Sequence, residues 1–210
     1  MTHPQRKSLE RIAAAYAWAV SLSPSPSHET IAPTRDVFRG RLDRFYREMV
    51  SASGSEADSS LLTAVAGEIG NNCFDQNLGQ WLDDPGCWFE WGFFLDKPVT
   101  WVVLADRGQG VLASLGRVDT SIHTDQEALD AAFSRILSGR SPEKRGNGLK
   151  FVKQIVTGDS KRGLLFLSGK GQMTLGNLGL SAKTYVPDLA SGENVPGTWA
   201  LLLWEKNYEN

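Results

Sequence analysis

The chain has 210 residues, the length of one substantial domain or of one domain with an appended helical segment. Hydrophobic residues make up 41% and charged residues 22%, so a packed core can form without disulfides or a structural metal. The formal net charge of −2 argues against a general nucleic-acid binder, and leaves local basic patches open.

Two amphipathic helices are predicted near the N-terminus. Residues 6–20 are rich in alanine, and their larger apolar side chains fall on one helical stripe. A signal peptide is the alternative for this apolar stretch, because it follows two basic residues. A Ser/Pro-rich run ends the helix, and apolar residues at helical spacing return over 35–50, before a polar linker at 51–55. We therefore predict an N-terminal helical extension over 1–54.

The remaining residues, 55–210, predict a single domain of mixed secondary structure. A longer helix is expected over 58–78, with Asp58 or Ser59 as its N-cap. After it the pattern predicts strands 88–95 and 99–105 as a hairpin, helices 126–137 and 148–156, and strands 164–168, 173–175 and 198–204. The expected fold class is an α/β (α+β) two-layer sandwich, in which helices cover one face of a mixed, mostly antiparallel sheet. No segment is long and apolar enough to span a bilayer.

The helix over 58–78 carries the first of three short polar boxes, with the sequence EIGNNCFD at 68–75. Glu68 and Asn72 are four residues apart, so on a helix they lie on one face and can meet one ligand. A carboxylate and an amide so placed can orient a water molecule and contribute an oxygen to Mg²⁺. The alternative is an ordinary polar helix face, because short motifs often match by chance.

The second box has the sequence DRGQG at 106–110 and follows the buried strand predicted over 99–105. An aspartate at the end of a strand can accept a hydrogen bond from an exocyclic amine. Gly108 and Gly110 allow backbone angles and close approaches that other residues do not. A hairpin turn is the alternative, because Asp and Gly are common turn residues.

The third box, Gly146, Asn147 and Gly148, directly precedes a helical pattern of apolar residues. Backbone N–H groups at the N-terminus of a helix attract anions, so a phosphate can dock there. The sequence contains no Walker A loop, and no βαβ context supports a dinucleotide-binding fingerprint. A flexible loop that enters a surface helix is the alternative.

In their order and spacing, the three boxes resemble the N, G1 and G2 boxes of the ATP-binding domain shared by gyrase, Hsp90, histidine kinases and MutL, the GHKL superfamily. The resemblance covers about residues 58–205, and its strength lies in that order and spacing. It implies a Bergerat-type ATP-binding fold over 55–210, with ATP and Mg²⁺ as ligands. It also implies that Glu68 is the general base that activates water, that Asn72 binds Mg²⁺, and that Asp106 recognises the adenine N6 amine.

The nucleotide-binding residues that the resemblance implies come from all three boxes and from a Gly-Thr pair that opens the last predicted strand. They are Asn72, Asp75, Asp106, Gly108, Gly110, Gly146, Asn147, Gly148, Leu149 and Thr198. The segment between Gly110 and Gly146 would form the ATP lid of the family. Its basic residues Arg140, Lys144 and Arg145 could approach the γ-phosphate, and a solvated basic loop is the alternative.

A second motif, around His28, is similar to the phospho-acceptor box of sensor histidine kinases, in which His-Glu is followed by a proline. That box needs a long two-helix hairpin for dimerisation. Here His28 follows a Ser/Pro-rich run and lies too few residues before Asn72 for a full hairpin. Cys73 and Cys87 form no CxxC or Cys/His cluster, so we expect buried thiols and neither a zinc site nor a disulfide framework.

The compact form of the chain looks similar to anti-sigma-factor serine kinases, which act on a protein partner. We therefore expect a cytoplasmic, Mg²⁺-dependent ATPase or ATP-using protein kinase that binds ATP or ADP. It would act with a protein partner or as a homodimer, and without nucleic acid or membrane. One alternative is a nucleotide-gated interaction module with little turnover. Another is that the boxes are turns in an α/β domain of other function.

Overall fold

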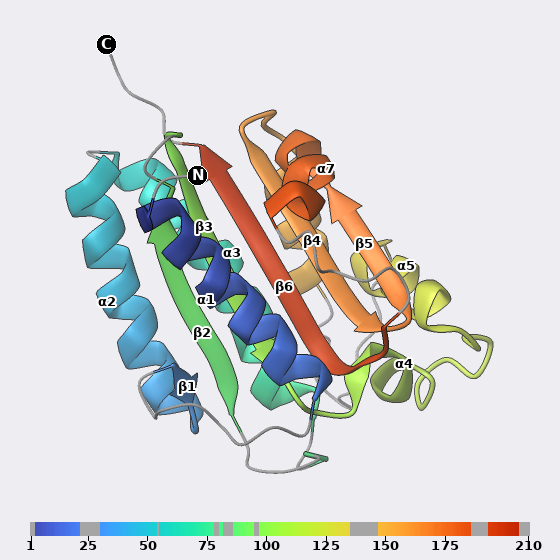
Figure 1. The fold of residues 1–210 in the computed structure, drawn as a ribbon. Helices are drawn as coiled ribbons and strands as arrows, with labels where there is room; N and C mark the ends of the chain where they lie inside the picture. Colours follow the sequence, from blue (N-terminus) through green and yellow to red (C-terminus); the bar gives the residue numbers. More distant parts are fainter. Residues whose placement is uncertain are drawn as a thin grey trace.

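An open six-stranded sheet forms the centre of the protein (Figure 1). The computed structural model describes residues 3–21, 30–53, 55–77, 80–81, 86–94, 97–134, 147–185 and 193–205. The strands are β1 (Ile31–Ala32), β2 (Cys87–Phe93), β3 (Val99–Asp106), β4 (Arg162–Gly169), β5 (Gly171–Leu175) and β6 (Val195–Glu205). They lie in the order β1-β2-β3-β6-β4-β5, and each neighbouring pair is antiparallel. The predicted α+β sandwich is confirmed.

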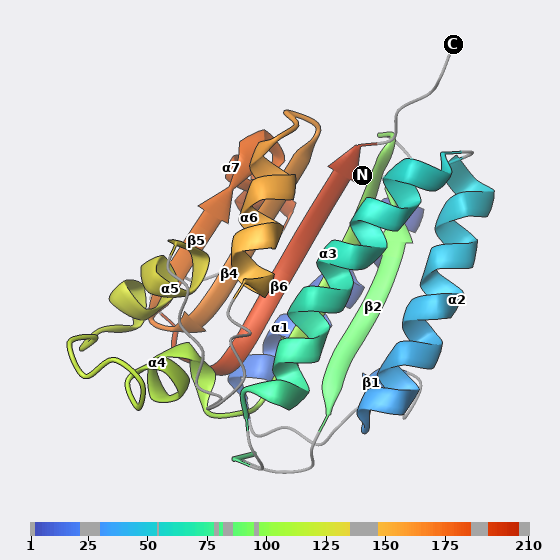
Figure 2. The same cartoon turned by 180° about the vertical axis from the view of Figure 1, so that it is seen from behind.

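Helices cover both faces of this sheet (Figures 1 and 2). One face packs against α2 (Arg35–Ser53), α3 (Glu56–Asp75), α5 (Asp125–Ser134) and α6 (Gly148–Thr157). The other face packs against α1 (His3–Val20) and α7 (Gly176–Tyr185). A short helix, α4 (Gly110–Leu115), lies beside α5 at one end of the sheet. The predicted helices 6–20 and 35–50 are therefore found, and the first of them covers the second face.

The central strands explain why two faces are covered, because their side chains are apolar on both sides. In β6, Trp199, Leu201 and Leu203 belong to the core under α1 and α7. The alternate residues Ala200, Leu202 and Trp204 belong to the core under α2, α3, α5 and α6. All of them are buried. A strand with this pattern needs cover on both faces of the sheet. The sequence predicted helices on one face only, and α1 and α7 cover the other face.

Several boundaries differ from the sequence prediction. The N-cap of α3 is Ser55, whose hydroxyl oxygen accepts a hydrogen bond from the Asp58 N–H at 3.3 Å, so Asp58 or Ser59 as the cap was wrong. The polar residues up to Ser53 continue α2 instead of forming a linker. The helix predicted to reach residue 78 ends at Asp75. The sequence analysis missed β1, α4 and α7.

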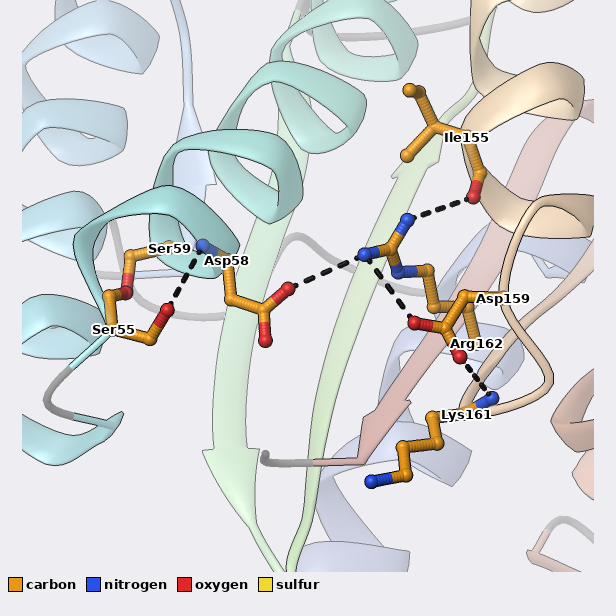
Figure 3. A network of polar contacts seen from close by, with 7 residues as sticks. All are labelled: Ser55, Asp58, Ser59, Ile155, Asp159, Lys161 and Arg162. Atoms are coloured by element: carbon orange, nitrogen blue, oxygen red, sulfur yellow. Dashed lines mark hydrogen bonds and ion pairs between the residues drawn. The ribbon is translucent and has the colours of Figure 1, made fainter. Parts of the chain in front are cut away.

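Asp58 has a different role, in a polar network that ties α3 to α6 and β4 (Figure 3). Arg162, at the start of β4, pairs with Asp58 at 3.3 Å and with Asp159 at 3.6 Å, and donates to the Ile155 carbonyl oxygen at 3.1 Å. Its guanidinium lies 4.2 Å from the ring centroid of Trp204. These contacts join the two helices whose other ends carry Glu68 and Gly148.

Candidate functional site

A cavity of about 430 Å³ lies between α3, α4, the N-terminus of α6 and the ends of β3 and β6. Its volume is within the range of small-molecule sites. The following predicted residues line it: Glu68, Asn72, Asp75, Asp106, Gly110, Asn147, Gly148, Leu149 and Thr198. Gly108 does not line the cavity but contacts Asp106 from behind, and Gly146 lies outside the described residues.

The floor of the cavity is a row of polar residues at the ends of three neighbouring strands. Thr198 of β6 pairs in register with Asp106 of β3 on one side and with Ser168 of β4 on the other. Side chains alternate along a strand, so all three point to the same face of the sheet as α3 and α6. The Ser168 hydroxyl accepts from the Val111 N–H at 2.9 Å and donates to the Gly197 carbonyl oxygen at 2.8 Å, which fixes the start of α4 over the strands.

The Asp106 carboxylate is 2% exposed, and the hydrogen bonds that it accepts come from neutral donors. Its Oδ1 accepts from the Gly108 N–H at 2.8 Å and from the Asn77 amide at 3.1 Å, and its Oδ2 accepts from the Thr198 hydroxyl. Burial raises the pKa of Asp106 above its ordinary value, and the hydrogen bonds from Thr198, Gly108 and Asn77 act in the opposite direction. The group is a fixed hydrogen-bond acceptor on the cavity floor.

Asn77 is a site residue that the sequence analysis missed. It lies just beyond α3, lines the cavity and is 4% exposed. Asn77 was not predicted as a site residue because the helix was expected to continue to residue 78, where Asn77 would lie on the helix surface. Once α3 ends at Asp75, the chain turns and brings Asn77 against the second box. An asparagine directly after a helix is typical of such a turn, and this was the available signal.

Glu68 and Gly148 meet where α3 and α6 come together. A Cβ atom at Gly148 would overlap with the Glu68 carboxylate, so glycine permits this close approach. Glu68 is half-buried, and no described residue holds its carboxylate by a hydrogen bond or an ion pair. A carboxylate in this state can accept a proton from a water molecule in the cavity.

The N-terminus of α6 faces the same space. Asn147 is its N-cap residue, and the Asn147 side chain makes no capping hydrogen bond. The N–H groups of the first helical turn therefore remain available, with the positive end of the helix dipole. A phosphate at this position would approach the Glu68 carboxylate, and the two negative groups would repel each other unless a cation lay between them.

Two arginines of α2, outside the region of the resemblance, also line the cavity. Arg35 forms an ion pair with Asp75, so the predicted ligand-binding residue Asp75 is already engaged with α2. Arg39, one helical turn further on, is exposed and makes no hydrogen bond or ion pair within the described part of the chain. The predicted extension over 1–54 therefore contributes to the cavity, and the i, i+4 spacing of the two arginines was the signal for it.

The cavity residues could hold Mg²⁺ only together with oxygen atoms from a bound nucleotide and from water. Among the described residues, no three His, Cys, Asp or Glu side chains lie close enough together to hold a metal ion. Asn72 can give one oxygen, and Mg²⁺ is commonly completed by phosphate oxygens and water. Cys73 and Cys87 are free and buried, as expected, and lie close to Asp106 at the back of the site.

Several predicted groups lie outside the described residues, namely Arg140, Lys144, Arg145 and His28. The described residues beside His28 do not form the helical hairpin of a phospho-acceptor domain. Ile31 and Ala32 pair with β2 as strand β1, and α1 packs on the sheet. Within the described ranges, a search for a helix with the length and hydropathy of a membrane span finds none.

Comparison with protein-family models, with curated proteins and with solved structures finds no match to this chain. Support for a function therefore comes from the residues of the cavity and from the order of the three boxes along the sequence.

Proposed function

We propose that the protein binds ATP with Mg²⁺ in this cavity and acts as a GHKL-type ATPase or ATP-dependent protein kinase. One observation carries the proposal: boxes that lie far apart in the sequence line a single cavity of suitable size, each with the group its role requires. Glu68 and Asn72 come from α3, Asp106 from β3, and Gly148 from the start of α6. A chance match of three short motifs does not require this convergence.

The base would lie over Asp106. The cavity is also lined by apolar side chains, including Ile69, Val111 and Phe166, which suit the faces of a purine. An exocyclic amine can donate to Asp106, whereas the 6-keto oxygen of guanine would meet an acceptor and be repelled. This arrangement supports a preference for adenine nucleotides.

The phosphates would extend toward the N-terminus of α6 and the rim at Arg39. Bound Mg²⁺ would neutralise charge on the phosphates beside Asn72 and Glu68. The Glu68 carboxylate would then take the proton from the attacking water or from a substrate hydroxyl. Because phosphoryl transfer depends mainly on positioning and charge, the same site serves hydrolysis or transfer to a protein.

The test is a thermal-shift and calorimetry panel with ATP, ADP and GTP, each with and without Mg²⁺. We expect adenine nucleotides to raise the melting temperature and GTP to have little effect, because a ligand that binds only the folded state stabilises it by mass action. Asp106→Asn should remove the difference between ATP and GTP. Absence of any nucleotide binding, or equal binding of ATP and GTP, would contradict the proposal.

A second function, a nucleotide-gated interaction module with little turnover, is favoured by one contact. Arg107, next to Asp106 in the second box, is 1% exposed and reaches the opposite face of the sheet. There it donates to the Trp18 carbonyl oxygen at 2.7 Å and stacks on the Trp18 ring at 4.4 Å. Base binding is thus adjacent to the docking of α1. Under this function, ATP should change the oligomeric state or partner affinity measured by light scattering, and Glu68→Ala should leave ATP turnover unchanged.

A further inference from the structure

We infer that Asn77 is a positioning residue that keeps Asp106 a hydrogen-bond acceptor and so sets the preference for a base with an exocyclic amine. The inference rests on the proposed function, because it concerns how the same cavity selects its base. Asn77 lies outside all three boxes, and no family resemblance assigns it a role.

The orientation of the Asn77 amide is determined by its three partners. Its Oδ1 accepts from the Gln109 N–H at 3.0 Å, and its Nδ2 donates to the Cys73 carbonyl oxygen at 2.5 Å and to Asp106 Oδ1 at 3.1 Å. A flipped amide would place a donor against the Gln109 N–H and an acceptor against the other two oxygens. The side of the Asn77 amide that faces Asp106 is therefore always the N–H donor.

The loop of the second box is shaped around this side chain. A Cβ atom at Gly108 would overlap with the Asn77 amide, so glycine at this position makes room for Asn77, while its backbone N–H donates to Asp106. The end of α3 and the start of the loop are thereby locked together through one buried amide. A side chain held by three hydrogen bonds in this way keeps its neighbours in a fixed geometry.

The charge environment makes the amide important. The groups that contact the Asp106 carboxylate are the Cys73 thiol of α3, the Thr198 hydroxyl of β6, the Gly108 N–H and Asn77. Cys87 of β2 is its register partner on the other side. None of these described groups carries a positive charge, and the neighbouring Arg107 points to the opposite face. Neutral donors alone therefore oppose protonation of the buried carboxylate, and Asn77 is one of these four.

The experiment compares Asn77→Leu with wild type for ATP and for inosine triphosphate, which has a 6-keto oxygen in place of the amine. Leucine is similar in size and donates no hydrogen bond. We expect ATP affinity to fall about tenfold and inosine triphosphate affinity to stay within about twofold, because only ATP needs the acceptor. Loss of one donor favours the protonated carboxyl, so the ATP defect should be largest at the lowest pH of a titration series and should shrink as pH rises. Wild type should vary less over this range.

Gln76→Leu is the matched control. Gln76 also follows α3 and lines the cavity, but its side chain accepts from the Ser114 hydroxyl at 3.1 Å and does not reach Asp106. Any loss it causes should be equal for the two nucleotides and independent of pH. If Asn77→Leu does not fold, Asn77→Ala is measured in the same way.

Equal loss of both nucleotides in the Asn77 variants, or a loss of ATP affinity that does not change with pH, would overturn the inference and leave Asn77 a structural residue. The proposed function would survive that result. If wild type itself fails to bind ATP or to prefer it over inosine triphosphate, the proposed function fails first. The two failures are therefore distinguishable.

Discussion

On the α1 side of the sheet, β3 and β6 hold the fully buried Trp101 and Trp199, whereas on the cavity side β3 ends in Asp106, whose register partner in β6 is Thr198. The tryptophan side gains stability from buried area. Within the described structure, the indole N–H groups of Trp18, Trp101 and Trp199 have no hydrogen-bond partner. On the cavity side, Asp106 has a partner at each oxygen.

The two faces should therefore respond to different changes. Large-area burial can offset a few unpaired donors, each of which costs about 1–3 kcal/mol. A ligand site cannot be filled in that way. Its floor carboxylate, Asp106, is paired with protein donors, whereas the buried Asn71 Oδ1 of the cavity lining has no partner within the described structure. Substitutions under α1 should therefore change stability, and substitutions in the cavity should change ligand binding or turnover.

The largest expected effect is on the α1 side. Trp199 is fully buried and packs edge-on against Tyr16 with ring centroids 5.7 Å apart. Trp199→Ala should lower the free energy of unfolding by about 3–5 kcal/mol, since it removes a large side chain from a packed core. Urea unfolding measures the loss, and ATP affinity below the melting temperature should change little. A large loss of affinity in the folded variant would show that the two faces are coupled.

Removal of the proposed base should affect only turnover. Glu68→Gln keeps the size of the side chain, and we expect the rate of ATP turnover to fall by about 10²-fold or more, because general base catalysis contributes at least that much. The melting temperature and the ATP dissociation constant should stay close to wild type. Steady-state phosphate release measures the rate. An unchanged rate would remove the catalytic role and favour the interaction module.

Asp106→Asn should weaken ATP binding by about 10–100-fold, the value of a hydrogen bond to a charged group.

The stability of the folded protein should also respond to pH through Asp106. Burial raises the pKa of Asp106, so the folded state binds this proton more tightly than the unfolded chain does. The contribution to stability is therefore greatest below the ordinary aspartate pKa and is lost as pH rises through the raised one. Wild type should lose stability over this window relative to Asp106→Asn, and the opposite trend would contradict the assigned burial.

The smallest effect is expected at the rim. Arg39→Ala should weaken ATP by about threefold to tenfold through loss of a charge near the phosphates, and should leave adenosine binding unchanged. Arg47→Ala is the matched control, because Arg47 is exposed on the same helix and does not line the cavity. Calorimetry at two salt concentrations distinguishes a local contact of Arg39 with the phosphates from a long-range effect of positive charge. Equal weakening by both variants would indicate only long-range charge.

Periodicity alone identified the helices α1, α2, α3, α5 and α6 and the hairpin of β2 and β3, because each has a long run of apolar residues with one clear period. It failed for α7, whose Gly176 and Gly179 lower helix propensity and which is stabilised by packing of Leu178 on the sheet. The cap at Ser55 was missed because several polar residues in succession could each have served.

The local sequence was enough to predict the residues to which we assign the site chemistry: Glu68 and Asn72 at helical spacing, the aspartate at the end of a strand, and the glycine box at the start of α6. Which other residues line the same cavity depends on the packing of distant elements. Asn77 reaches Asp106 because α3 ends at Asp75, and Arg39 reaches the cavity because α2 packs beside α3. Local patterns record which residues are apolar or polar, whereas contacts between distant segments depend on how the packed elements meet, and no short window of sequence contains that.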